Sequence, residues 1–182
     1  MPKPKVILDA KAIKAALGRM ARAMATAAKK EDFVLVGIQR TGVFLAQRLA
    51  KLLGEKSGRN VPVGTLDIAM HRDDLHDKLM PPVYPTSIPF DVTGKTVVLV
   101  DDVLFSGRTI RAALGALTDL GRPRKVQLAV LVDRGHRELP IQPDFVGKTV
   151  RTQPEDHVEM RLVEDGGADE VLLFKNRKKA SS

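Results

Sequence analysis

The sequence predicts an α/β fold in a single domain: a mainly parallel sheet with helices on both faces. Continuous apolar runs of strand length indicate strands covered on both faces, and amphipathic helical segments separate these runs, as βαβ units require. The runs are 33–38, 96–100 and 126–132. The 182 residues suit one domain, whose ends, 1–8 and 175–182, we expect to be flexible.

Composition limits the chemistry. Hydrophobic residues make up 43% and charged residues 29%, which is typical of a globular protein. The absence of cysteine excludes disulfides, thiolate zinc sites and a cysteine nucleophile. No apolar run has the length of a signal peptide or membrane span, so we expect a cytoplasmic protein without a membrane partner. The net charge of +8 favours RNA or a phosphorylated small molecule, although surplus charge without a binding role is equally common.

The elements can be placed by their apolar spacing. Asp9 is a suitable N-cap for the first helix, Gly54 closes the second and Gly121 ends the third. Residues 71–93 form a long excursion rich in charge and proline, as in a functional lid or a disordered loop. In chain order, the expected elements are a helix over 10–30, a strand over 33–38, a helix over 43–53, strands over 61–70 and 96–100, a helix after the loop 101–109, and strands over 126–132, 157–163 and 170–174.

Residues 97–109 carry the strongest chemical signal. An apolar strand ends on Asp101 and Asp102, and a short loop with Ser106, Gly107 and Thr109 leads into a helix. Exposed N–H groups at a helix N-terminus and its positive dipole end favour an anion, and glycine lets the backbone approach it closely. The loop therefore predicts a phosphate site. The two acids would repel phosphate, so they indicate ribose hydroxyls, a metal, or both.

Other patterns are weaker. The Gly-Lys-Thr triplets at 94–96 and 147–149 lack the earlier glycine that completes a P-loop. The histidines and aspartates within 71–77 follow no known metal-ligand spacing and are typical of a solvated loop. Ser106 lacks the Gly-x-Ser-x-Gly elbow of a serine hydrolase.

Residues 97–109 resemble the signature of type I phosphoribosyltransferases, in which a strand, two acids and a loop of hydroxyls and glycine hold 5-phosphoribosyl 1-pyrophosphate (PRPP). Segments 37–46, 61–75 and 127–141 resemble the PyrR family, and the resemblance runs from about residue 6 to 163. These proteins are bacterial regulators of pyrimidine operons that also act as uracil phosphoribosyltransferases.

The resemblance implies the type I phosphoribosyltransferase fold, with a long flexible loop and a small hood, and transfer from PRPP to uracil with release of diphosphate. Asp101 and Asp102 would face the ribose hydroxyls and help to place Mg²⁺, and Arg72 would close over the site as part of a lid. The implied PRPP- and nucleotide-binding residues are Arg40, Thr41, Arg72, Asp101, Asp102, Val103, Leu104, Phe105, Ser106, Gly107, Arg108, Thr109, Arg134 and Val158.

The resemblance also implies how the nucleotide-binding residues divide their tasks. Residues 104–109 would hold the 5′-phosphate, Arg40-Thr41 and Arg134 the leaving pyrophosphate, and Arg134 with the backbone of Val158 the uracil. Asp133 would contact the metal or its waters. Relatives have Thr-Arg-Gly where this chain has Arg-Thr-Gly at 40–42, which leaves open which residue contacts pyrophosphate.

RNA binding is the second implied function. Relatives bind a leader-mRNA stem-loop through a basic face, and UMP strengthens that binding. The matching residues here are Arg19, Arg22, His136, Arg137 and Lys148. Gly18 and Gln142 stand where relatives have Thr and Arg, which puts part of the RNA contact in doubt. We also expect a homo-oligomer, a dimer or higher. The alternative is a purine (hypoxanthine or guanine) phosphoribosyltransferase without an RNA role, because base selection cannot be placed from sequence.

Overall fold

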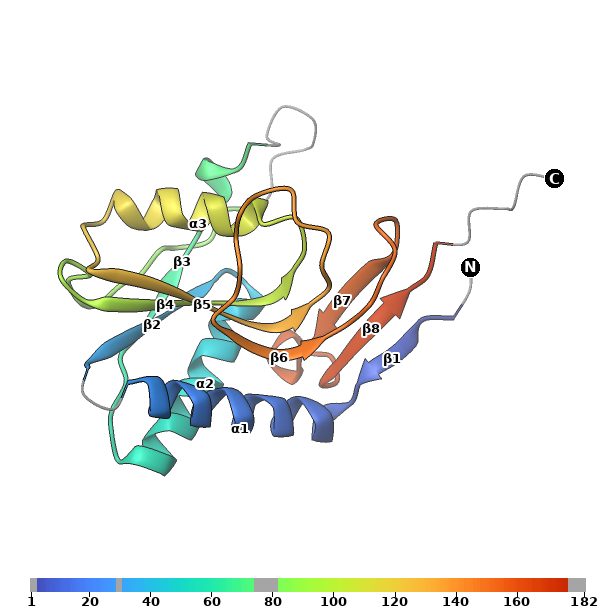
Figure 1. Cartoon of the computed structure of the whole chain (residues 1–182), viewed down its shortest axis with the longest axis horizontal. Helices are drawn as coiled ribbons and strands as arrows, with labels where there is room; N and C mark the ends of the chain where they lie inside the picture. Colours follow the sequence, from blue (N-terminus) through green and yellow to red (C-terminus); the bar gives the residue numbers. More distant parts are fainter. Residues whose placement is uncertain (1–2, 29–30, 74–81, 177–182) are drawn as a thin grey trace.

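A five-stranded parallel sheet forms the centre of the fold, and a three-stranded antiparallel sheet lies beyond the carboxyl ends of its strands (Figure 1). This computed structural model describes residues 3–28, 31–73 and 82–176. The strand orders are β3-β2-β4-β5-β6 and β1-β8-β7. The elements are β1 Lys5–Leu8, α1 Ala10–Ala27, β2 Phe33–Ile38, α2 Thr41–Ser57, β3 Val63–Leu66, the 3-10 helix η1 Ala69–His71, β4 Thr96–Leu104, α3 Arg108–Thr118, β5 Lys125–Asp133, β6 Phe145–Thr149, β7 His157–Arg161, the 3-10 helix η2 Val163–Asp165 and β8 Glu170–Phe174.

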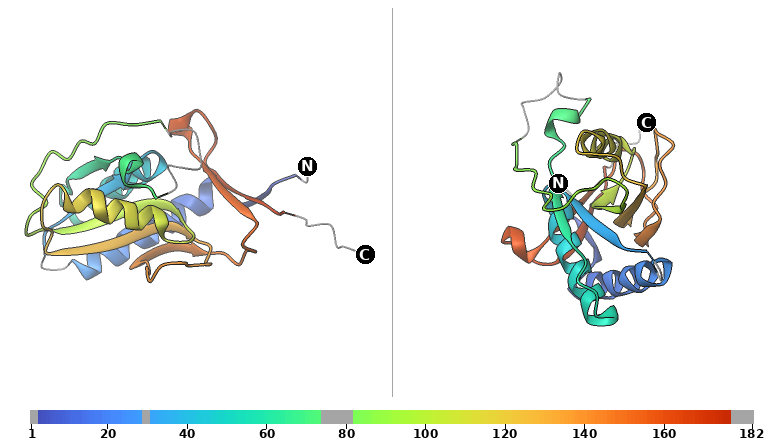
Figure 2. Two further views of the ribbon diagram at one scale, coloured as in Figure 1. Left: turned by 90° about the horizontal axis from the view of Figure 1, so that it is seen from above. Right: turned by 90° about the vertical axis from the view of Figure 1, so that its left-hand side faces the viewer.

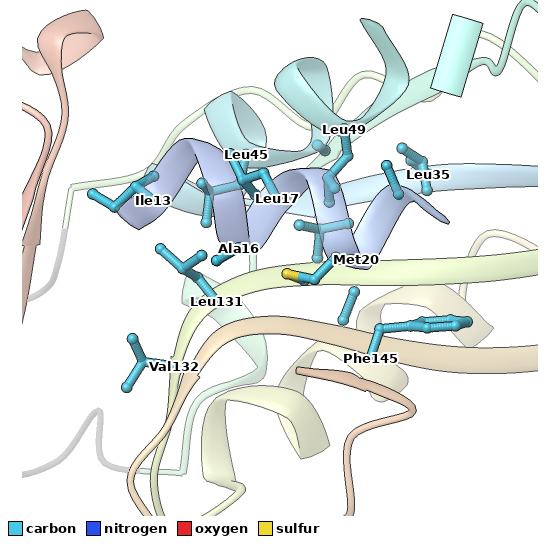
Figure 3. Close-up of a cluster of buried hydrophobic side chains, with 14 of the residues drawn as sticks. Ile13, Ala16, Leu17, Met20, Leu35, Leu45, Leu49, Leu131, Val132 and Phe145 are labelled. Atoms are coloured by element: carbon cyan, nitrogen blue, oxygen red, sulfur yellow. The ribbon is translucent and has the colours of Figure 1, made fainter. Parts of the chain in front are cut away.

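Helices cover both faces of the parallel sheet, which confirms the predicted fold class. α1 and α2 lie on one face and α3 on the other (Figure 2). Because side chains alternate along a strand, Val98 and Val100 of β4 pack with α1 and α2, whereas Val97 and Leu99 pack with α3. Figure 3 shows the first of these clusters, in which side chains of α1 gather with those of α2 and β5. Burial on both faces explains why the strands read as continuous apolar runs.

The helix boundaries differ from those predicted. α1 ends at Ala27 rather than residue 30. α2 begins at Thr41, passes through Gly54 and ends at Ser57, and Gly58 closes it in the left-handed conformation with φ 65°. The prediction that Gly54 ends this helix was wrong because a glycine inside a helix costs only about 1 kcal/mol, and the helix continues past its buried Leu53.

The strands around the predicted phosphate site also differ in extent. β4 continues past residue 100, and its ladder with β5 places Asp101 opposite Val130 and Val103 opposite Val132. Both acids therefore lie within the strand rather than after it, because pairing with β5 outweighs the low frequency of carboxylates in buried strands. β3 is shorter than predicted, and the chain turns into η1 before residue 70.

Two strands were not predicted. β1 lies in the segment expected to be a flexible end, yet it pairs antiparallel with β8, Lys5 opposite Leu173. β6 pairs parallel with β5 at the sheet edge, and its residues after Phe145 are only partly buried, so it lacks an apolar run. β7 and β8 pair antiparallel as predicted. We call β1, β7, β8 and η2 the hood.

The long excursion after β3 is described at both flanks, and its centre, 74–81, lies outside the described residues together with the tail beyond 176. The flanks are joined at their base. Thr65 and Ser87 exchange backbone hydrogen bonds of 2.8 and 2.9 Å, and the Asp67 carboxylate accepts one from the Tyr84 N–H at 2.7 Å. Within the described ranges, no helix is long and apolar enough to span a membrane.

Candidate active site

The candidate site lies at the carboxyl ends of four neighbouring strands. β3, β2, β4 and β5 lie side by side, and each is followed by residues that the sequence assigned to function. Loops at this edge of a parallel sheet line a shared crevice. The observed strand order therefore brings Arg72, Arg40, Asp101 and the loop 104–109, which we call the phosphate loop, to one edge.

Two adjoining cavities of about 300 Å³ each lie at this edge. The first is lined by the phosphate loop, and the second by the polar residues that follow β2 and β3 together with Tyr84. Arg72, Asp101, Val103 and Thr109 line both cavities. Asp101 thus lies between the two chambers, with Asp102 beside the second, and the arrangement suits a ligand with an anion at each end and hydroxyls between them.

The phosphate loop has the local geometry that its sequence predicts. Gly107 precedes α3 in the left-handed region with φ 93°, which favours glycine. A Cβ at this position would also lie 3.3 Å from Ile141 Cδ1. The Ser106 hydroxyl accepts a hydrogen bond from the Arg108 N–H at 3.4 Å. Arg108, Thr109 and Ile110 of the first turn of α3 line the first cavity, where N–H groups at a helix start and the helix dipole favour a phosphate.

Asp101 and Asp102 are held at the seam by backbone hydrogen bonds. Asp101 Oδ1 accepts from the Asp102 N–H at 3.0 Å, and Asp102 Oδ1 accepts from the Val103 N–H at 2.7 Å. Burial and the neighbouring Asp102 carboxylate raise the pKa of Asp101 well above its ordinary value. Burial also raises the pKa of Asp102, against the lowering effect of its hydrogen bonds. A cationic centre or hydroxyl donors placed here would relieve this desolvation.

Arg40 and Thr41 lie where α2 begins, beside the second cavity. The Arg40 guanidinium forms an ion pair with Asp165 of the hood and lies 5.8 Å from the centre of the Tyr84 ring. Hydrogen bonds to Tyr84 and Asp165 raise the pKa of Arg40. Close packing fixes this loop, because a Cβ on Gly42 would lie 2.4 Å from the Val100 carbonyl oxygen. Arg40 and Thr41 therefore both line the second cavity in a tightly packed loop.

Arg72 lies between two contacts that hold the start of the excursion against α3. His71 Nε2 lies 2.7 Å from Asp119 Oδ2, and Arg108 Nη1 donates to Asp73 Oδ2 at 2.8 Å. These contacts join both sides of Arg72 to α3, and its side chain lines both cavities.

Arg134 does not line either cavity, although the resemblance implies that it holds the leaving pyrophosphate. Its side chain is buried, and its guanidinium lies 4.1 Å from the centre of the Phe105 ring. Its other contacts are with residues 152–154, including a 2.9 Å hydrogen bond to the Gln153 carbonyl. Burial lowers the pKa of Arg134. The sequence could not predict this, because these partners lie far along the chain.

Asp133 is likewise engaged elsewhere. Its Oδ2 accepts a 2.7 Å hydrogen bond from Arg137, and its Oδ1 one of 3.0 Å from the Gly135 N–H. Although burial opposes the effect, these bonds lower the pKa of Asp133. Asp133, which the resemblance implies as a metal contact, is thus the ion-pair partner of Arg137.

The residues implied in RNA binding fall in two places. Arg19 and Arg22 are exposed on α1, and Arg19 Nη2 donates to the Gly147 carbonyl at 3.0 Å, beside the exposed Lys148 of β6. His136 and Arg137 are half-buried after β5, where Arg137 also donates to the carbonyls of Phe105 and Ile141. The structure therefore brings the α1 and β6 residues together, while most of Arg137 serves internal contacts.

Val158 lies on β7, opposite Leu173 of β8, and its side chain is buried in the core. Asp67 and Tyr84 were missed by sequence reasoning although both line the second cavity. Asp67 follows directly after β3, so its place at the carboxyl end of a strand was the signal that could have identified it. Tyr84 carried no such signal, because its position depends on how the excursion returns.

Comparisons with known proteins agree with this geometry. A family model described as "Phosphoribosyl transferase domain" matches residues 5–165. The "Bifunctional protein PyrR" of a Roseiflexus species is 55% identical, covering 94% of this chain and 95% of its own. That of Thermus aquaticus is 52% identical, covering 92% and 94%.

Solved structures show a similar fold. The hypoxanthine phosphoribosyltransferase of Trypanosoma cruzi has a TM-score of 0.72 and covers 95% of this chain and 97% of its own. Its identity is only 14%, so this likeness concerns the fold alone. The family match and the identities of about half over nearly the whole chain are decisive: this chain belongs to the PyrR family of phosphoribosyltransferases.

Proposed function

We propose that this protein transfers the 5-phosphoribosyl group of PRPP to uracil, giving UMP and diphosphate, and regulates pyrimidine genes by UMP-dependent binding to leader mRNA. The observation that carries the enzymatic part is the pair of cavities that share the buried Asp101. PRPP has a phosphate at one end, a pyrophosphate at the other and ribose hydroxyls between them. The relatives named "Bifunctional protein PyrR" support the choice of pyrimidine and the second role.

The mechanism follows from where charge develops. As the bond from C1′ to pyrophosphate breaks, the electron pair leaves with pyrophosphate and the ribose becomes oxocarbenium-like. Uracil N1 forms the new bond to C1′, and the proton that N1 loses passes to water. The carboxylates of Asp101 and Asp102 accept hydrogen bonds from the ribose hydroxyls and stabilise the developing positive charge. Fixed orientation of the two reactants contributes up to about 7–11 kcal/mol.

The phosphate loop holds the 5′-phosphate through the N–H groups at the start of α3 and the hydroxyls of Ser106 and Thr109. Arg40 and Thr41 hold the leaving pyrophosphate at the beginning of α2, and Arg72 lies over both chambers, where it neutralises that leaving group and helps to exclude water. The Arg40 guanidinium must exchange Asp165 for the pyrophosphate oxygens.

Mg²⁺ would be held in this site mainly by the phosphate oxygens of the substrate and less by protein side chains. Within the described part of the chain, no group of three or more His, Cys, Asp or Glu side chains could hold a metal ion. Asp101 and Asp102 offer the oxygen donors that Mg²⁺ prefers, and Mg²⁺ keeps several waters and binds substrate phosphates. When bound, it would neutralise charge on the pyrophosphate. Asp133, already paired with Arg137, fits only as a contact through water.

The test of the enzymatic function is release of diphosphate from PRPP with uracil, hypoxanthine, guanine or orotate as acceptor. We expect turnover with uracil. Turnover only with a purine would instead support the alternative, a purine phosphoribosyltransferase. Size-exclusion chromatography with light scattering in the same preparation tests the proposed homo-oligomer.

The regulatory function rests on the exposed basic side chains of α1 and β6, which present Arg19, Arg22 and Lys148 together. Binding of a leader stem-loop should be stronger with UMP. If about six phosphates are contacted, log affinity should fall with log salt at a slope of roughly −4. A flat salt response, or no effect of UMP, would contradict this role.

A further inference from the structure

Arg134 joins two parts of the active site without lining either cavity. Its guanidinium stacks 4.1 Å from the centre of the Phe105 ring, and Phe105 lines the cavity of the phosphate loop. On the other side, the same guanidinium donates to the Gln153 carbonyl at 2.9 Å, and to Thr152 Oγ1 and the Pro154 carbonyl at 3.3 Å. One planar group therefore bridges the phosphate loop and the segment that leads into β7.

The phosphate-loop side of this bridge is firmly held. The carbonyl oxygens of three successive loop residues each accept a hydrogen bond from the segment after β5. The Leu104 carbonyl accepts from the Arg134 N–H at 3.0 Å, the Phe105 carbonyl from Arg137 Nη1 at 3.1 Å, and the Ser106 carbonyl from the Glu138 N–H at 2.9 Å. The backbone of the loop is thus fixed at three successive residues that line the first cavity.

The opposite side is equally constrained. Asp156 is 7% exposed, and its carboxylate accepts hydrogen bonds from the Gln153 N–H at 2.8 Å and the Asn176 N–H at 3.2 Å. These bonds lower the pKa of Asp156 and keep it ionised. Segment 152–156 is therefore a closed turn directly before His157 and Val158 of β7.

We propose that Arg134 is a positioning residue that fixes the separation between the phosphate loop and segment 152–158, so that a nucleoside 5′-monophosphate is recognised by its two ends at once. This inference rests on the proposed function, together with the placement of uracil beside the backbone of Val158 that the family resemblance implies. A ligand that reaches two preformed subsites gains affinity because binding of the second end is intramolecular, and this gain depends on the spacing being held. Planar stacking and several fixed donors suit arginine, and lysine cannot reproduce them.

The experiment compares the two ends of the ligand separately and joined. Affinities of UMP, ribose 5-phosphate, uridine and pyrophosphate are measured by calorimetry for the wild type and Arg134→Lys. We expect UMP to bind about tenfold more weakly to the variant, while ribose 5-phosphate and uridine each change less than about threefold. Phe105→Leu, which removes the stacked ring from the other side, should give the same pattern. The double variant should show less than the sum of both effects, because both break one bridge.

Arg161→Lys is the matched control. Arg161 is a hood arginine that forms ion pairs with the carboxylates of Glu159 and Glu170, and its replacement should leave all four affinities unchanged. Unchanged UMP affinity in Arg134→Lys overturns the inference. The inference is also overturned if ribose 5-phosphate loses as much affinity as UMP, or if only uridine or only pyrophosphate loses affinity. Each of these results would mean that Arg134 acts on one end of the ligand alone. A wild type that does not bind UMP refutes the proposed function and the inference with it.

Discussion

Replacing Asp101 by Asn should make the free protein more stable and the enzyme far slower. Burial and Asp102 raise the pKa of Asp101 in the folded state above its unfolded value. Below the unfolded value, about 3.9, the carboxyl is protonated in both states and contributes nothing to the pH dependence. As pH rises through and beyond that value, ionisation increasingly penalises the folded state. Asn mimics the protonated form and can still accept the hydrogen bond from the Asp102 N–H.

The magnitude follows from the buried position of the group. Asp101 is 8% exposed, and a buried charged group without full compensation costs about 1–3 kcal/mol or more. For a chain of this length, the melting temperature should therefore rise by about 2–4 °C for each kcal/mol at pH 8, with no gain near pH 3. Loss of the carboxylate that faces the developing positive charge should lower kcat by about 10²–10³-fold.

Thermal unfolding of the ligand-free protein between pH 3 and pH 8, together with steady-state kinetics, tests both parts. Asp169→Asn is the control of opposite sign, because its hydrogen bond with Arg48 lowers the pKa of Asp169, and this variant should lose stability at pH 8. An Asp101→Asn variant with a lower melting temperature at pH 8, or with near-normal kcat, would refute the reasoning.

The remaining predictions concern contacts that hold the hood and Arg72. Arg48 of α2 pairs with Glu164 at 2.6 Å and Asp169 at 2.7 Å and lowers the pKa of both. Arg48→Gln should therefore reduce the melting temperature at pH 7, and this loss should shrink as pH falls below the ordinary pKa values of the two acids. A loss that stays equal across this range would contradict the reasoning. Asp119→Asn should reduce kcat/KM for PRPP about two- to fivefold. The melting temperature should change little, because the exposed contact of Asp119 with His71 is worth about 0–1 kcal/mol. The exchanged pair, His71→Asp with Asp119→His, should restore kcat/KM. Failure of the exchange to restore kcat/KM would show that the contact does not position Arg72.

The fold was predictable where buried strands appear in the sequence as continuous apolar runs. β2, β4 and β5 are covered on both faces, so their apolar runs identified the parallel sheet. β6 was not predictable, because as an edge strand it has only partly buried residues after Phe145. β1 was missed for a related reason, because only Leu8 among its residues is fully buried and the strand has no apolar run. It forms because β8 offers an edge with which it can pair.

The local structure of the site was predictable from neighbouring residues. The order of acids, hydroxyls and glycine in 101–109 specifies a strand, a loop and a helix start, and these residues other than Asp102 line the first cavity. A long side chain is different, because its direction is decided by distant partners. Nothing near Arg134 in sequence indicates Gln153, and only the folded chain shows that the guanidinium lies away from the cavities.

Net charge illustrates the same distinction. Several arginines that contribute to the +8 charge are paired with acids within the fold, among them Arg48, Arg108 and Arg137, so their fields are largely cancelled locally. Exposed cations of α1, such as Lys11 and Arg22, form no ion pair with any other residue that the structure describes. The exposed cations of α1 beside β6 are therefore among those available to attract a polyanion. Reversal of charge on α1 should consequently reduce RNA affinity and its salt slope together, while the same change at a paired arginine should act mainly on stability.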